Sequence, residues 1–429
     1  MNGAKLHSGT AAMTVPTAMP VDHIPKPSDG AVTGGFIALY TLAQIGAFVA
    51  FIPMLNLLLP LKAEAVDLSG KAVLLSQVMV IGAVVAGFAN LAAGVLSDGT
   101  RGPWGRRRPW IAGGAVAVAA THGLVYLADG LWSLIAAVVA FQIALNLMFG
   151  PLNAVLADRV PDHQKGTVSA LQGLALPTAG LFSAVVLAIA LGGLAERFLI
   201  TALAVPLLVL PFALLVPDHS EAGLPATRPR FSLGVLTDRD FRLAFTSRLL
   251  VQVSITLNVL YLLFYLQDVA TLPSASGATA ETAFGWLMTA GTLGGLIFGF
   301  IGGILSDRTR RRRVLVMSGG VLMAVGAGLM VAQPVWPGPL LAQIVFGIGL
   351  GLYSTVDIAL VAEVLPDRSS AGRDLGVMNL AITVPQIAAP LIGLGVLLAF
   401  GGELRWVFAI SAVFAFVGAI AVMGIRRVR

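Results

Sequence analysis

The sequence predicts an all-α membrane protein of twelve transmembrane helices, arranged as two pseudo-symmetric six-helix bundles. Hydrophobic residues make up 57% of the 429 residues and charged residues only 11%, with a mean hydropathy of +0.90. A soluble domain is usually about 25% charged. The apolar residues gather in long runs, and one loop sequence between such runs occurs twice, once in each half of the chain. These observations exclude a soluble enzyme.

The individual helices follow from the length of the apolar runs. A helix that crosses the hydrocarbon core needs about 20 apolar residues. Twelve segments meet this requirement, at 34–59, 73–97, 110–128, 131–156, 167–191, 198–216, 242–266, 284–305, 314–333, 338–362, 375–399 and 405–425. We therefore divide the chain into a disordered tail (1–32), a first bundle (33–216), a linker (217–241), a second bundle (242–425) and a basic tail (426–429).

The basic residues predict the orientation in the membrane. Most of the 27 Lys and Arg residues lie in alternate loops, a set that begins with the N-terminal tail and ends with the C-terminal tail. Because such loops are retained on the cytoplasmic side, both termini and the linker are expected there, in a plasma (inner) membrane. The same topology accounts for a pI near 10.0, so the lipid bilayer, and no nucleic acid, is the expected partner.

The repeated loop is the most specific feature of the sequence. Its first copy begins at Gly94 and reads GVLSDGTRGPWGRRRP, and its second copy begins at Gly303 and reads GILSDRTRRRR. The two copies are 209 residues apart (303 minus 94). Two further matches have similar offsets, because Asp158 corresponds to Glu363 and Pro177 to Pro385. A chain made of two related six-helix repeats is the plan of a large class of secondary transporters.

Both loops resemble the signature loop of the major facilitator superfamily. The late glycine, seven residues after Asp98, and the RRRP-aromatic ending resemble the glycoside–cation symporter branch, including the sucrose–proton symporters. The resemblance implies the major facilitator fold and a gate in which Asp98 faces the start of the eleventh span. It assigns the gating loops to Gly94, Asp98, Gly105, Arg106, Arg107, Arg108, Gly303, Asp307 and Arg311. The alternative is that the arginines only fix the topology.

One basic and one acidic residue lie clearly inside predicted spans. Arg248 is in the seventh span and Asp357 in the tenth, and both are within about 10–12 Å of the cytoplasmic ends at 1.5 Å per residue. An ionisable residue inside a membrane is costly and predicts a function. We expect an Arg248–Asp357 pair, or Asp357 alone, to couple transport to protons. The alternative is a static ion pair that holds the two spans together.

Amide and phenol side chains recur along the spans that line the cavity in this superfamily. Gln142, Asn146 and Asn153 fall on one helical face. The predicted substrate cavity comprises Tyr40, Gln44, Gln142, Asn146, Asn153, Gln252, Tyr353, Asn379 and Gln386. Such groups suit a neutral, hydroxyl-rich ligand, whereas the competing explanation is hydrogen bonding between helices. Gln142 and Asn153 stand where sucrose symporters carry charges, so sucrose specificity is not implied.

The expected function is secondary active transport by alternating access, as proton-coupled symport of a sugar or glycoside by a monomer. No phosphate-binding loop for ATP and no protease or esterase motif occurs in the sequence, so the chain is not expected to be an enzyme. No cofactor or metal is expected, and the proton gradient is the expected driving force. Two alternatives remain open: a proton-driven exporter of drug-like or metabolite molecules, and a non-transporting receptor or assembly scaffold.

Overall fold

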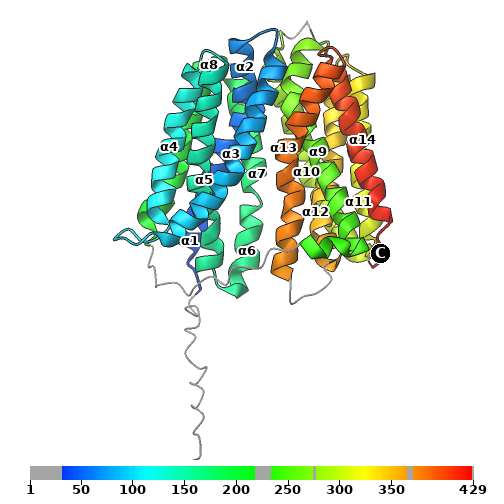
Figure 1. The fold of residues 1–429 in the computed structure, drawn as a ribbon. Coiled ribbons are helices and arrows are strands. Elements are labelled where there is room, and N and C mark those ends of the chain that lie inside the picture. The colour runs from blue at the N-terminus through cyan, green and yellow to red at the C-terminus, as the bar shows by residue number, and fades with distance from the viewer. Residues whose placement is uncertain (1–30, 218–232, 274–276, 365–370, 428–429) are drawn as a thin grey trace, which may run out of the picture.

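The structure, a computed structural model, describes residues 31–217, 233–273, 277–364 and 371–427. The described residues are 86% helical, and an isolated bridge between Thr271 and Val335 is the sole β-type pairing among them. Twelve helical segments are long and apolar enough to cross a membrane. They stand side by side as two bundles, the first blue to green and the second green to red (Figure 1).

The first bundle contains the first six spans. The first span is built of α1 (Gly34–Pro53), the π-helix η1 (Met54–Leu58) and α2 (Leu59–Val66), and the fifth of α6 (Asp162–Gln172), α7 (Ala175–Leu181) and the π-helix η2 (Phe182–Ala190). The other four are single helices: α3 (Lys71–Gly99), α4 (Arg108–Leu127), α5 (Leu131–Arg159) and α8 (Leu194–Leu215).

The second bundle is preceded by a short 3₁₀ helix, η3 (Leu233–Thr237). Its six spans are single helices: α9 (Arg239–Asp268), α10 (Ala280–Thr309), α11 (Arg312–Ala332), α12 (Gly338–Val364), α13 (Ala371–Ala399) and α14 (Leu404–Met423). The all-α, twelve-span prediction is confirmed.

The helices extend beyond the predicted spans where polar residues cap them. Helix α9 begins at Arg239, inside the predicted linker, because the side chain of Asp238 accepts hydrogen bonds from the backbone N–H groups of Asp240 and Phe241. An acidic N-cap of this kind stabilises the first turn of a helix. Residues 1–30 and 218–232, which include most of the predicted tail and linker, lie outside the described residues.

Glycines allow three helices of the second bundle to pack closely. A side chain at Gly347 or Gly351 of α12 would collide with the backbone of α10, at Gly291 and Gly295 respectively. On the other side of α12, a side chain at Gly349 would collide with the backbone of α11. Small residues permit such backbone approach in membrane bundles, where helices associate mainly through van der Waals contact. These packed helices hold α12 rigidly, and α12 carries Asp357.

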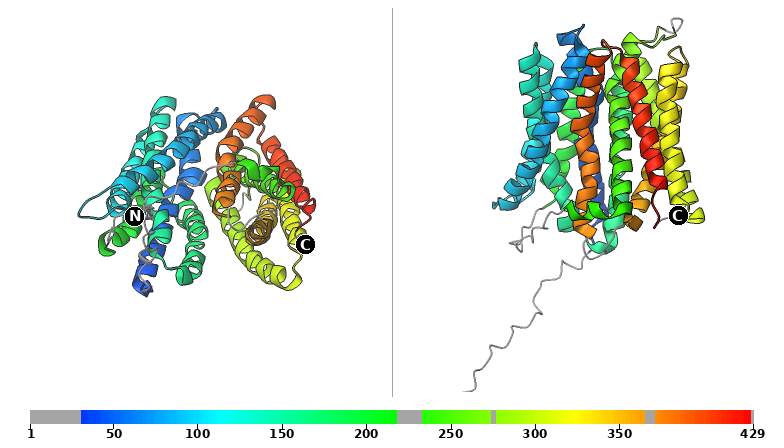
Figure 2. Two further views of the ribbon diagram at one scale, coloured as in Figure 1. Left: turned by 60° about the horizontal axis from the view of Figure 1, so that its bottom comes forward. Right: turned by 45° about the vertical axis from the view of Figure 1, so that its right-hand side comes forward.

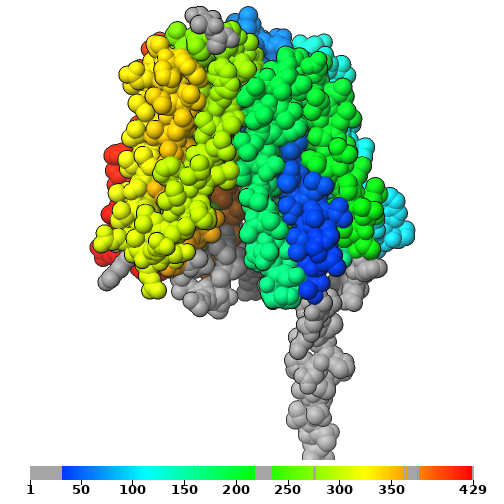
Figure 3. All heavy atoms as spheres, turned by 180° about the vertical axis from the view of Figure 1, so that it is seen from behind, coloured from blue at the N-terminus to red at the C-terminus, as the bar shows by residue number. Residues whose placement is uncertain are grey.

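The two ends of the molecule differ. We call the end that carries the 99–107 and 309–311 loops, the start of α1 and the end of α14 the basic face, which is the lower end in Figure 1. Viewed toward this face, the bundles form two distinct groups of helices that lie side by side (Figure 2). From behind, the molecule is hollowed between the halves toward the basic face (Figure 3). Toward the opposite face, hydrogen bonds and an ion pair join Glu64, Lys71 and Ser76 of the first half to Tyr261, Gln267 and Asp268 of the second.

Candidate functional site

The predicted intramembrane ion pair is present. Arg248 Nε lies 3.2 Å from Asp357 Oδ2, so the charges of α9 and α12 meet directly. The side chain of Asp357 is only 5% exposed, whereas that of Arg248 keeps 18% exposure. Arg248 lies nine residues after the start of α9 and Asp357 seven residues before the end of α12. Both are therefore about 10–14 Å from the basic face along their helices.

Two buried hydroxyl groups lie near this ion pair and have no hydrogen-bond partner among the described residues. Tyr353 lies one turn before Asp357 and is buried, and its hydroxyl faces Ser247 and Asp357. Neither Tyr353 Oη nor Ser247 Oγ reaches a standard hydrogen bond within the described parts of the chain. Buried polar atoms are paired in most native structures, so unpaired ones call for a functional explanation. Gln252 lies one turn beyond Arg248 on α9 and is partly buried.

The polar residues of α1 and α5 form a second cluster, in the first half. Gln44 Nε2 donates to Asn153 Oδ1 at 3.0 Å and lies 3.4 Å from Tyr40 Oη. The Tyr40 hydroxyl in turn donates to the Leu152 carbonyl at 3.0 Å. Gln44 is 2% exposed, whereas Asn153 is exposed. Gln44 lies ten residues after the start of α1 and Asn153 six before the end of α5, at about 9–15 Å from the basic face.

Two other predicted cavity residues, Gln142 and Asn146 of α5, lie against α3. Asn146 Oδ1 accepts from Asn90 Nδ2 of α3 at 3.2 Å, and Asn146 Nδ2 donates to the Gln142 carbonyl at 2.8 Å. Gln142 is buried against Gly82 of α3. The polar residues of α5 thus form hydrogen bonds to two other helices, through Asn146 to α3 and through Asn153 to α1. The sequence analysis did not single out Asn90, although it is an exposed amide inside an apolar span.

Helix α13 supplies the last two predicted cavity residues. Asn379 and Gln386 are both exposed on α13, and Thr383, also exposed, lies between them at helical spacing. No described hydrogen bond joins Asn379 or Gln386 to the amide cluster or to the ion pair. They are therefore not part of the hydrogen-bonded cluster around Gln44, and their place in the substrate cavity stays a prediction.

The first gating loop is an ion network inside the first half. Arg107 bridges two carboxylates, with Nη2 2.8 Å from Asp98 Oδ1 and Nε 3.0 Å from Asp158 Oδ2. Arg106 Nη2 contacts the same Asp158 oxygen at 2.6 Å. Gly105 has a φ of +84°, a conformation that favours glycine. Gly94 has open space where a side chain would lie.

The second loop repeats only part of this network. Its ion pair is made by Arg312, whose Nη1 lies 2.5 Å from Glu363 Oε1; the predicted gating role of Arg311 stays a prediction. Arg311 is exposed at the N-cap of α11. Arg312 minus Arg107 and Glu363 minus Asp158 both equal 205, so the pairs are true counterparts. The second loop is four residues shorter between the aspartate and the arginines, so the offset of 209 at the aspartates becomes 205 at the arginines. Asp307 is exposed and has no ion pair with any described residue, and Gly303 packs on Thr355.

The last arginine of each loop caps a helix, a role that the sequence analysis missed. Arg108 donates to the Ala213 and Leu214 carbonyls at 2.5 and 2.7 Å, at the end of α8. Its counterpart Arg313 donates to the Ile425 carbonyl after α14. A cation at a helix C-terminus pairs with unsatisfied carbonyls and with the negative end of the helix dipole.

Asp98 does not meet the eleventh span in this arrangement. Its side chain is 55% exposed and pairs with Arg107, and it contacts no side chain of α13 that the structure describes. The reason is geometric, since the halves lie apart at the basic face (Figure 3). The predicted contact between Asp98 and the eleventh span therefore belongs to a different arrangement of the halves and stays a prediction.

The family model described as Major Facilitator Superfamily matches residues 38–277 and 243–429. The chain belongs to the major facilitator superfamily. It is therefore a multi-pass membrane protein of a transporter family, and its fold agrees with the resemblance carried by the two loops.

Relatives with assigned functions are more distant. A 131-residue stretch, 30% of this chain, is 29% identical to a 3-(3-hydroxy-phenyl)propionate transporter of Escherichia coli (strain K12). The chain spans 30% of the length of that curated relative. This likeness is too short to carry an activity on its own.

Solved transporter structures share the fold. The nucleoside transporter NupG superposes with a TM-score of 0.69 at 14% identity, over 91% of this chain and 98% of that one. A D-xylose-proton symporter gives 0.67 at 14% identity, over 91% and 97%. A bacterial homologue of the human lysosomal transporter Spinster, in an inward-facing and occupied conformation, gives 0.66 at 14% identity, over 92% and 96%.

Proposed function

We propose that this major facilitator protein is a proton-coupled symporter of a sugar or glycoside that works by alternating access. The observation that carries the proposal is the Arg248–Asp357 ion pair, 3.2 Å long and placed inside the membrane-spanning part of a transporter fold. No other described pair of opposite charges lies so far from both faces. Charges in such a position are costly to maintain unless they serve transport.

The pair has the chemistry that coupling requires. Protonation of Asp357 would remove one charge and leave Arg248 without its partner, and Arg248 keeps 18% exposure through which a proton or a ligand can reach it. In a low-dielectric site, a change of one charge alters the balance between two packed states by several kcal/mol. The unpaired hydroxyls of Tyr353 and Ser247 provide neighbouring proton or ligand contacts.

The proposed cargo follows from the polar groups at the same depth in the other half. The cluster of Gln44, Asn153 and Tyr40 offers amide and phenol groups and no charge. Amides donate and accept, so they match the paired donors and acceptors of sugar hydroxyls. The late glycine of the first gating loop, at Gly105, supports the glycoside–cation symporter branch. The D-xylose-proton symporter shares only the fold.

The charged loops support the proposed sidedness. The basic face carries Arg106, Arg107 and Arg108 in one half and Arg310 to Arg313 in the other, and basic loops are retained in the cytoplasm. We therefore place the basic face and both termini in the cytoplasm, with the chain as a monomer in the plasma (inner) membrane. In that orientation the hollow of Figure 3 faces the cytoplasm, which supports an inward-facing arrangement of the halves.

A second candidate cargo is an organic carboxylate, which Arg248 favours. A substrate carboxylate could replace Asp357 as the partner of the guanidinium once Asp357 is protonated, because arginine binds carboxylates in a bidentate manner. The partial likeness to the 3-(3-hydroxy-phenyl)propionate transporter points to the same class. Aromatic hydroxy acids therefore belong in the ligand panel.

The test is a ligand screen followed by transport. Purified protein is scanned for thermal stabilisation by sugars, glycosides, aromatic acids and drug-like molecules, and each hit is assayed for uptake into proteoliposomes under an imposed pH gradient. Uptake of a sugar or glycoside driven by an inward proton gradient supports the proposal. If a hit accumulates in the liposomes only under an outward proton gradient, substrate is exchanged for protons, which indicates the exporter alternative. Binding without flux of any hit indicates the receptor alternative.

A further inference from the structure

We infer that the halves are held together at the face opposite the basic face by a two-layer closure, with an outer ionic layer centred on Lys71 and an inner layer centred on Tyr261, and that both layers must break in every transport cycle. The inference rests on the alternating-access part of the proposed function and adds which contacts form the barrier. It requires neither the sugar substrate nor the proton.

The outer layer surrounds a buried lysine. Lys71 begins α3, and its side chain is only 7% exposed. Its Nζ atom lies 2.9 Å from Asp268 Oδ1 and 2.8 Å from Gln267 Oε1, both at the end of α9 in the other half. It also lies 3.5 Å from Glu64 Oε1 of its own half. The ammonium group is thus held by three side chains, and two of them belong to the other half.

Gln267 of the second half bonds to both Lys71 and Glu64 of the first half. Its Oε1 accepts from Lys71, and its Nε2 donates to Glu64 Oε2 at 2.7 Å, so both ends of its amide are satisfied by the first half. The Phe264 ring lies 5.3 Å from Lys71 Nζ. A buried ammonium needs such a complete set of partners to offset its loss of water.

The inner layer lies one to two helical turns deeper. Tyr261 Oη is 2.6 Å from Ser76 Oγ, which belongs to α3 of the first half, and both residues are fully buried. The Tyr261 ring also occupies the space beside Gly393 of α13, where a side chain would collide with it. Tyr261 precedes Asp268 by seven residues and Ser76 follows Lys71 by five, so the layers are stacked about 8–10 Å apart.

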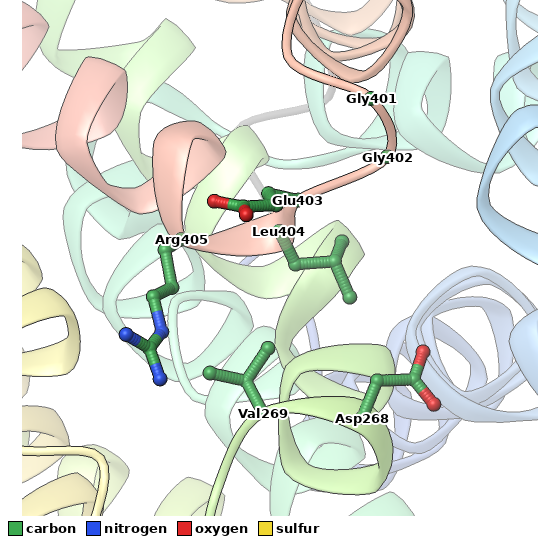
Figure 4. A pocket seen from close by; sticks show the side chains of 7 residues that line it. All are labelled: Asp268, Val269, Gly401, Gly402, Glu403, Leu404 and Arg405. Carbon is green, nitrogen blue, oxygen red and sulfur yellow. The ribbon is translucent and has the colours of Figure 1, made fainter.

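Solvent already reaches the outer layer from one side. A cavity of about 460 Å³ is lined by Asp268, Val269 and residues 401–405. Asp268 lies at its edge, with Glu403 and Arg405 across the cavity (Figure 4), and keeps 45% exposure. Water can therefore hydrate the Asp268 carboxylate when its contact with Lys71 breaks. The inner layer, in contrast, has no exposed atom pair and separates the outer layer from the hollow.

Substitutions in the two layers should act on the closed state alone. Lys71→Met leaves Glu64 and Asp268 on opposite halves with no cation between them, whereas in the open state both carboxylates return to water. In the closed state the two carboxylates, 26% and 45% exposed, then face each other as like charges, which disfavours that state relative to the open one. Tyr261→Phe deletes the bond to Ser76 and keeps the ring against Gly393.

The test measures the positions of the two halves without any substrate. The chain contains no cysteine, so spin labels can be placed at introduced cysteines and their distances measured by double electron–electron resonance. One label pair, Leu68→Cys and Val335→Cys, lies at exposed sites on the closed face. The other pair, Gly102→Cys and Thr309→Cys, lies in the two loops of the basic face.

Lys71→Met and Tyr261→Phe should each produce a second population in which the 68–335 distance is longer and the 102–309 distance is shorter. The control is Lys62→Met, because Lys62 donates to the Tyr126 carbonyl within the first half. It should leave both distributions unchanged. Unchanged distributions in Lys71→Met and Tyr261→Phe would overturn the closure. Since the readout needs no cargo, a failed sugar assay would count against the proposed function and not against the closure.

Discussion

Arg107 contacts Asp98 at 2.8 Å and Asp158 at 3.0 Å, so one guanidinium joins the ends of α3 and α5 within the first half. The counterpart in the second half is simpler, with Arg312 on Glu363. The duplicated loop thus anchors helices inside each half, while the polar contacts of Lys71 and Tyr261 join the halves at the other face. This division permits each half to move as a rigid body during alternating access.

The two acidic partners should therefore differ in importance. Asp158→Asn removes an acceptor shared by Arg106 and Arg107, whereas Glu363→Gln removes an acceptor of one arginine that also bonds to the Ala359 carbonyl at 3.0 Å. We expect Asp158→Asn to slow transport severalfold more than Glu363→Gln. The measurement is the initial rate of uptake at equal protein per liposome. Equal rates in the two variants would contradict the asymmetric anchor.

The helix caps predict an effect on stability and not on transport. Arg108→Ala removes the donor to two carbonyls at the end of α8, and should lower stability by about 1–2 kcal/mol. Its thermal unfolding midpoint in detergent should fall, while the apparent affinity for any transported ligand stays unchanged. Arg101→Ala is the control, since Arg101 is exposed and reaches only the Asp98 carbonyl at 3.4 Å. A loss of ligand affinity in Arg108→Ala would assign this arginine to the site instead.

The amide cluster predicts an effect on affinity. Gln44→Ala deletes the bond to Asn153 and the contact with Tyr40, and should weaken binding of a hydroxyl-rich ligand about two- to tenfold, the value of one or two hydrogen bonds. Titration calorimetry or ligand-dependent thermal shift measures this change. Ser318→Ala is the matched control, because its hydroxyl bonds only to the Val314 carbonyl on an exposed surface. Unaltered affinity in Gln44→Ala would identify the cluster as a structural tie between α1 and α5.

The intramembrane arginine predicts a transport defect that lysine rescues in part. Arg248→Gln leaves Asp357 buried at 5% exposure without a counter-charge, and uptake should fall by about tenfold or more, as expected for an unpaired buried charge. Arg248→Lys keeps the charge and should retain more activity. A folded Arg248→Gln protein with normal uptake would contradict a functional role for the pair.

The sequence was sufficient for features that depend on local patterns. The apolar runs predict all twelve spans, and the 205-residue offset between Asp158 and Glu363 predicts their equivalent places. Arg248 and Asp357 could be paired because each is the only clear charge of its sign inside a span and both lie at one depth. Such inferences need only the helical rise and the cost of charge in a membrane.

Features that depend on packing between distant segments could not be predicted. Lys71 and Asp268 are 197 residues apart, and each looks like an ordinary charge at a helix end. The pairing of Arg312 with Glu363 could not be predicted, because four consecutive arginines look alike in the sequence and only the path of the backbone brings one of them to Glu363. Asn90 was missed because a single amide in an apolar helix has no periodic pattern.

The most direct test of the central claim is proton movement driven by the transported ligand. In proteoliposomes that contain an internal pH dye, addition of the ligand found by the screen should acidify the lumen in the wild-type protein. Asp357→Asn should abolish this acidification while ligand exchange across the membrane continues. Asp129→Asn, an exposed carboxylate outside the spans, should behave as wild type. Ligand-driven acidification that persists in Asp357→Asn would contradict the claim that Asp357 couples transport to protons.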